Sequence, residues 1–105
     1  MTILTEEKTQ KKLFDRGYVS INDFPDDVES ALTWFVLEEK EQKRTKYQNK
    51  YFLLHASGLS GVVEKIYLWE CGDSFDMEKN RAYVALIDKY DFGFATKARF
   101  VNLIR

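Results

Sequence analysis

This sequence has few of the residues that identify a disulfide scaffold, a metal cluster or a divided chain. It contains one cysteine, Cys71, and one proline, Pro25. A single cysteine excludes an intrachain disulfide and a metal cluster built from cysteines. The sequence also lacks a linker rich in Gly, Ser and Pro, an internal repeat, and an uncharged run of roughly 18 residues that could span a membrane. The 105 residues therefore predict one domain, 1–105, without a membrane partner.

The sequence has no excess of charge of either sign. Lys and Arg total 16 against 17 Asp and Glu, which gives a net charge of -1. A protein that binds duplex DNA usually carries a basic excess, so only local patches can indicate a partner here. Residues 1–7 have neither the basic start nor the apolar stretch of a secretory signal. We therefore expect a reducing, cytoplasmic location.

What the sequence does contain is enough apolar material for a folded core, with 45% hydrophobic and 15% aromatic residues. Residues 5–16 predict a short helix, because Thr5 can cap its start and Gly17 can end it. The apolar content of this stretch is thin. Segment 1–17 is therefore expected to be a loosely docked N-terminal helix.

A second and longer helix is predicted from Pro25 onward. Proline suits a first helical turn, because its missing N–H would be unpaired there in any case. Apolar residues then follow at helical spacing: Val28, Leu32, Phe35 and Val36. Apolar residues stop over 38–46, which indicates either a protruding helical turn or a mobile loop.

The second half of the sequence is rich in aromatic and β-branched residues. Residues 47–57 and 62–71 predict a hairpin around the turn 58–61. Residues 81–89 favour a third strand, with a helix over 76–90 as the alternative, and 95–104 predict a last strand. The predicted fold class is α+β: two N-terminal helices packed on a C-terminal antiparallel meander of about four strands.

The predicted hairpin can be aligned residue by residue. If Ser57 faces Val62, side-chain alternation places Tyr51, Leu53, Ile66 and Leu68 on the core face. The opposite face then gathers aromatic and cationic residues, which are favoured at interfaces. We predict that face as the partner-binding site, and its residues are Phe52, Tyr67 and Trp69 with Lys50 and Lys65.

A local basic run offers a different site. Cations interleaved with aromatic rings are the ingredients of single-strand nucleic-acid binding, in which bases stack on rings and phosphates meet cations. Acidic residues in the same stretch, Glu38, Glu39 and Glu41, offset much of this charge. The alternative basic patch consists of Lys40, Lys43, Arg44, Lys46 and Tyr47, within the segment 40–51.

The sequence gives little support for catalysis. Cys71 and His55 could form a nucleophile and base, but the predicted register separates them by roughly 23 Å at about 3.3 Å per residue. In that register His55 faces Glu64 instead, as a structural pair. The acidic loop of Asp73, Asp76 and Glu78 does not have the spacing of a calcium loop. We therefore expect no catalytic residue, no metal and no cofactor.

The sequence favours a small non-catalytic protein-binding module, an adaptor or inhibitor of a larger assembly. Its size and lack of motifs are typical of products of compact mobile-element genes. Another protein is the expected partner, and a monomer or homodimer is the expected state. The second hypothesis is a protein that contacts nucleic acid through segment 40–51.

Overall fold

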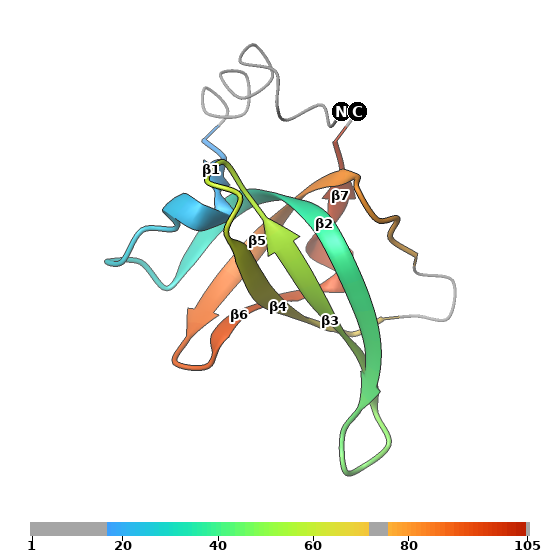
Figure 1. Ribbon diagram of the computed structural model, residues 1–105. Coiled ribbons are helices and arrows are strands. Elements are labelled where there is room, and N and C mark those ends of the chain that lie inside the picture. Colours follow the sequence, from blue (N-terminus) through green and yellow to red (C-terminus); the bar gives the residue numbers. More distant parts are fainter. Residues whose placement is uncertain (1–16, 72–75, 105) are drawn as a thin grey trace.

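The computed structural model describes residues 17–71 and 76–104, and these form strands joined by short connections. Figure 1 shows the arrangement. Two three-residue 3-10 segments, η2 (Ile21–Asp23) and η3 (Ala98–Phe100), are the helical elements of the described residues. The strands are β1 (Val19–Ser20), β2 (Ser30–Arg44), β3 (Lys50–Ser57), β4 (Val63–Trp69), β5 (Ala82–Tyr90), β6 (Gly93–Lys97) and β7 (Asn102–Leu103).

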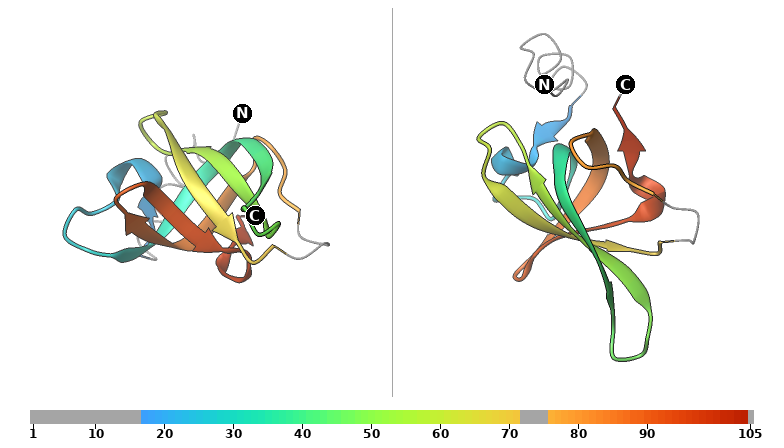
Figure 2. Two further views of the ribbon diagram at one scale, coloured as in Figure 1. Left: turned by 90° about the horizontal axis from the view of Figure 1, so that it is seen from below. Right: turned by 45° about the vertical axis from the view of Figure 1, so that its right-hand side comes forward.

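Five of these strands close into a barrel, in the order β2-β3-β4-β6-β5 and back to β2. The pair β4–β6 is parallel, and the other pairs of the ring are antiparallel. The two short strands β1 and β7 lie beside β2 and β5. Figure 2 (left) shows these strands from below, and the main cluster of buried side chains is formed largely by them. The predicted α+β fold, with two N-terminal helices packed on a meander, is therefore wrong, because the described residues form a β-barrel.

The residues of the predicted second helix form β2, the longest strand. It pairs with β5 over Ser30–Val36 and with β3 over Val36–Arg44, so Val36 has a partner on both sides. Five consecutive residues, Thr33 to Leu37, are buried. The barrel core buries one side of this stretch, and a smaller cluster with Tyr18 and Ile104 covers the other. Because both sides are covered, the run lacks the alternation that usually reveals a strand.

The polar tail of the predicted helix is also part of β2. A register shift between Leu37 and Glu39 marks the point where β2 leaves β5 and continues along β3. The resulting β2–β3 hairpin projects beyond the barrel in two different views (Figures 1 and 2). The basic run at 40–46 is therefore neither a helical turn nor a loop along most of its length.

The predicted β3–β4 hairpin is present, but its register differs by one residue. Ser57 pairs with Val63, not with Val62. As a result Phe52 and Leu54 point into the core, together with Ile66 and Leu68. The prediction was right about the sides of β4 and wrong about the sides of β3, because a one-residue shift turns every side chain of one strand over.

The last two predicted strands have different outcomes. The third strand is confirmed as β5, and the alternative helix over 76–90 is wrong. The last predicted strand is divided into β6, η3 and β7, so 95–104 does not run as one strand. The first predicted helix, over 5–16, lies outside the described residues.

The connectivity of the barrel identifies its topology. We number the five barrel strands β2, β3, β4, β5 and β6 from first to fifth along the chain. Around the barrel, their order is then first, second, third, fifth and fourth, and the fourth strand pairs with the first. The third and fifth strands are the parallel pair. A five-stranded barrel with this connectivity is the OB-fold. Its second and third strands are β3 and β4 here, and their outer face carries the candidate site.

Candidate functional site

Three aromatic rings lie together on the outer face of β3 and β4. The ring centroids of Tyr51 and Trp69 are 4.6 Å apart, and the ring of Tyr67 lies 6.2 Å from each of them. The three rings are within 37° of one another in orientation. We call these three residues the aromatic platform. All three residues are intermediate in exposure, so each keeps some surface open to the solvent.

The aromatic surface continues from the platform onto the turn between β5 and β6. The Phe92 ring lies 5.1 Å from the Tyr67 ring at an angle of 88°. Tyr90 stacks on Phe92 at 5.1 Å with the two rings almost parallel. Phe92 and Tyr90 are 59% and 50% exposed, so both residues are open to the solvent. A continuous row of five rings therefore crosses this side of the barrel.

Lysines surround the platform on three neighbouring strands. Lys43 of β2 is the register partner of Tyr51, and Lys97 of β6 is the register partner of Trp69. Lys65 stands two residues before Tyr67 on β4 and therefore points to the same side. The combination gives apolar ring faces with cations at their edges.

Acidic residues limit this cationic surface on the β2 side. His55, which shares the outer face, contacts Glu41 at 2.9 Å. This hydrogen bond lowers the pKa of the Glu41 carboxyl, and hydrogen bonds from Lys79 and the Lys40 amide lower that of Glu39. Both carboxylates therefore stay charged at neutral pH. The three lysines beside the platform therefore share this side of the barrel with the carboxylates of Glu39 and Glu41.

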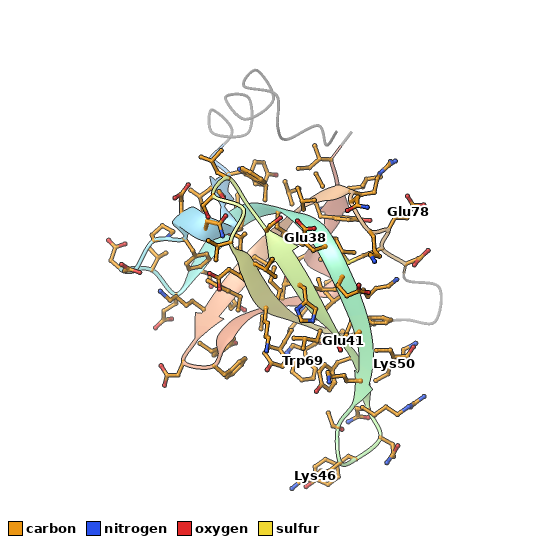
Figure 3. The ribbon with its side chains drawn as sticks, viewed as in Figure 1. Glu38, Glu41, Lys46, Lys50, Trp69 and Glu78 are labelled. Carbon is orange, nitrogen blue, oxygen red and sulfur yellow. The ribbon has the colours of Figure 1, made fainter. Side chains whose placement is uncertain are left out.

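The tip of the β2–β3 hairpin carries a separate group of exposed residues, at the lower end of Figure 3. Tyr47 is 75% exposed, and the Lys46 ammonium lies 5.1 Å from the centre of its ring. The Arg44 guanidinium donates to the carbonyl of Gln48 and so braces the turn. This tip resembles the platform in composition, with a ring and a cation side by side.

The structure brings together part of the predicted partner-binding site. Tyr67, Trp69 and Lys65 share the platform side, as the sequence indicated. Phe52 is only 8% exposed and belongs to the barrel core, so its placement on this face was wrong. Lys50 is the first residue of β3 and pairs with Arg44 of β2. It stands two residues before Phe52 and therefore lies on the same side of the strand as Phe52, not on the platform side.

The alternative basic patch is divided by the structure. Lys43, Arg44, Lys46 and Tyr47 lie on the projecting hairpin. Lys40 instead reaches the connection before β5, where its ammonium contacts Asp76 at 2.9 Å and the Met77 carbonyl at 2.9 Å. Lys40 therefore stabilises the connection before β5.

Sequence reasoning missed four members of this surface: Tyr51, Tyr90, Phe92 and Lys97. Tyr51 was placed in the core by the one-residue error in register. Phe92 lies in a turn that no sequence pattern connects with the hairpin. The parallel pairing of β4 with β6, which brings Lys97 beside Trp69, leaves no local signal in the sequence.

The described residues contain no arrangement that favours catalysis. The Cys71 thiol donates to the Leu68 carbonyl, and burial raises the pKa of that thiol. His55 contacts Glu41, and its register partner is Lys65, not the predicted Glu64. No group of three or more His, Cys, Asp or Glu within 17–71 and 76–104 could hold a metal ion. Asp73 lies outside these ranges.

No protein-family model matches the sequence, and no curated protein matches it. Among the described residues, no helix has the length and apolarity needed to cross a membrane. Any function must therefore be argued from the geometry of the barrel and its surface.

Proposed function

We propose that this protein binds single-stranded nucleic acid across the outer face of β3 and β4. The observation that carries the proposal is the aromatic platform, with Tyr51, Tyr67 and Trp69 in mutual contact. OB-folds bind oligonucleotides on this face, with help from the loops at its ends. Because fold alone does not define function, the proposal rests on the side chains found there.

The chemistry of the platform suits unpaired bases. A base can stack on an aromatic ring whatever its identity, and such stacking contributes about 1–3 kcal/mol per base. Bases in a duplex are already stacked and paired, so their faces cannot reach the rings. The platform therefore favours single strands over duplexes and has little base preference.

The surrounding lysines suit the backbone of the same ligand. Lys43, Lys65 and Lys97 stand at the edges of the platform, where phosphates would lie if the bases covered the rings. Phosphate contacts of this kind make the affinity fall as salt rises. The near-neutral net charge of -1 indicates that this attraction is local, not spread over the whole surface.

Tryptophan fluorescence offers a direct test. The two tryptophans differ in position, since Trp34 is 4% exposed and Trp69 belongs to the platform. In a Trp34→Phe background the emission therefore reports on the platform. Titration with oligothymidylate is expected to quench this emission, and the matching duplex is expected to quench it much less.

Matched variants distinguish the platform from the rest of the surface. Tyr67→Ala is expected to weaken oligothymidylate binding by about 1–3 kcal/mol, the contribution of one stacked base. Leu32→Ala is the control, because Leu32 is a 46% exposed apolar side chain on the outer face of β2 and β5. Equal affinity of wild type, Tyr67→Ala and Leu32→Ala would reject the proposal.

An adaptor or inhibitor that binds a protein through these same rings is the competing explanation. It predicts no response to oligonucleotides of any length at low salt. The projecting hairpin and the row of rings would then form a protein interface, in which large aromatic side chains supply most of the binding energy.

A further inference from the structure

Glu70, the residue that follows Trp69, contacts two cations beside the platform. One carboxylate oxygen lies 3.6 Å from the Lys97 Nζ and the other lies 3.9 Å from the Arg99 Nε. Glu70 also has φ 58, a left-handed conformation that few residues other than glycine adopt. This backbone conformation places an acidic side chain where the strand β4 ends.

The first of the two cations, Lys97, belongs to the same side of the barrel as the rings. Lys97 is the register partner of Trp69 in the parallel pair β4–β6, and partners in register point to the same face. Arg99 follows in η3, where its guanidinium lies 4.9 Å from the centre of the Phe100 ring. A lysine and an arginine therefore converge on one carboxylate at the edge of the platform.

The contacts of Glu70 are weak enough to be exchanged. All three side chains are substantially exposed: 53% for Glu70, 43% for Lys97 and 63% for Arg99. The two distances exceed the range of about 2.7–2.9 Å typical of close charge-assisted hydrogen bonds. Exposed ion pairs of this kind contribute little to stability. A second anion with better geometry can therefore replace the carboxylate.

From this arrangement we infer that Lys97 and Arg99 form a phosphate-binding position, which Glu70 occupies when no strand is bound. This inference rests on the proposed function. A phosphodiester of a strand lying on the platform displaces the Glu70 carboxylate and takes its place between the two cations. Glu70 thereby lowers the affinity for nucleic acid and helps to limit non-specific binding of polyanions.

The test is the oligothymidylate affinity of Glu70→Gln, which keeps the size of the side chain and removes its charge. We expect binding that is roughly 2- to 5-fold tighter than wild type at about 0.1 M salt, the range that loss of an exposed ion pair allows. The slope of log affinity against log salt should stay close to that of wild type, because the strand makes the same phosphate contacts in both proteins. Glu78→Gln is the matched control, since Glu78 lies 3.9 Å from the Arg81 Nε and away from Trp69 in Figure 3.

Two further variants keep the inference falsifiable. Glu70→Asn tolerates the left-handed backbone better than glutamine and also lacks the charge, so it should show the same increase in affinity if Glu70→Gln folds poorly. Adding Lys97→Gln and Arg99→Gln to Glu70→Gln should abolish this increase, because the phosphate-binding position is then lost. A thermal melt of each variant separates effects on folding from effects on binding.

The outcomes separate this inference from the proposed function. If Tyr67→Ala weakens binding while Glu70→Gln and Glu70→Asn bind as wild type does, the strand does not reach Lys97 and Arg99. The inference is then overturned and the proposed function stands. If wild type binds no oligonucleotide at all, both are overturned together.

Discussion

The Ser20 hydroxyl occupies the space beside Gly58 that any larger residue would need. A Cβ on Gly58 would lie 2.1 Å from the Ser20 Oγ and 2.9 Å from the Asn22 Oδ1. These two side chains hold the β3–β4 turn, since Ser20 accepts from the Leu59 amide and Asn22 accepts from the amides of Gly58 and Ser60. The turn between the platform strands is therefore anchored from the end of β1 and from η2.

A comparison of two glycines in this turn tests the anchor. Gly58→Ala is expected to destabilise the fold by about 2 kcal/mol or more, because overpacking forces the anchoring side chains to move. Gly61→Ala is the control, since a Cβ there meets nothing within 4 Å and only the positive φ of 80° opposes it. Its expected cost is about 1 kcal/mol. Urea denaturation that shows equal costs would contradict the anchoring role of Ser20 and Asn22.

Alanine substitutions on the two opposite sides of β2 should lower the stability of the fold by unequal amounts. Phe35 is 0% exposed inside the barrel, whereas Leu32 is 46% exposed. Phe35→Ala is therefore expected to lower the free energy of unfolding by about 3–5 kcal/mol, the usual cost of emptying an aromatic core site. Leu32→Ala should cost less than about 1 kcal/mol, as is usual for an exposed position. Similar large losses in both variants would indicate the helical packing that the sequence pattern suggested.

The same contrast explains why the sequence predicted a helix where the structure has the strand β2. Val28, Leu32, Phe35 and Val36 match a helical period, and the expected strand alternation is missing because both sides of 33–37 are covered. The cover on the outer side comes from Tyr18 and Ile104, which are distant in sequence. Local periodicity cannot reveal such long-range burial.

The same limit applies to the candidate site. Features that depend on neighbouring residues could be predicted from the sequence, whereas features that depend on distant residues could not. The aromatic content of 62–71 predicted the strand β4 and its outward Tyr67 and Trp69. The side of β3 depended on one residue in the turn, and the position of Phe92 depended on the closure of the barrel. Composition therefore predicted an aromatic face, whereas register and topology decided which rings belong to it.

Asp76 gives a prediction for the pH dependence of stability. The hydrogen bond from the Lys40 ammonium, at 2.9 Å, lowers the pKa of the Asp76 carboxyl below its ordinary value of 3.8. A lowered folded pKa means that the stabilisation is present above the unfolded pKa and is lost as pH falls through the folded pKa. Wild type should therefore lose more stability than Asp76→Asn between about pH 6 and about pH 2.

Urea denaturation of both proteins at the two pH values measures this difference. Lys40→Met gives an independent comparison, because it removes the donor and leaves the carboxyl. An NMR titration should then show the Asp76 pKa closer to 3.8 than in wild type. Equal acid sensitivity of wild type and Asp76→Asn would show that this contact does not persist in solution.

The cations and rings of the platform should affect nucleic-acid binding in different ways. Lys43→Gln and Lys65→Gln each remove one cation from the platform edge, so each should reduce the magnitude of the slope of log affinity against log salt by about 0.7. Tyr67→Ala should lower the affinity at every salt concentration and leave the slope unchanged, because stacking releases no counterions. Fluorescence titrations with oligothymidylate at several salt concentrations measure both quantities.

Lys79→Gln is the control for charge, because Lys79 contacts Glu39 at 3.1 Å on the acidic β2 side and is not beside the platform. Its expected effect on the slope is close to zero, although the net charge changes by the same amount as in Lys43→Gln. If Lys79→Gln reduced the slope as much as the platform variants did, the attraction would depend on the total charge of the protein. In that case the lysines around Tyr51 and Trp69 would not define the path of the strand.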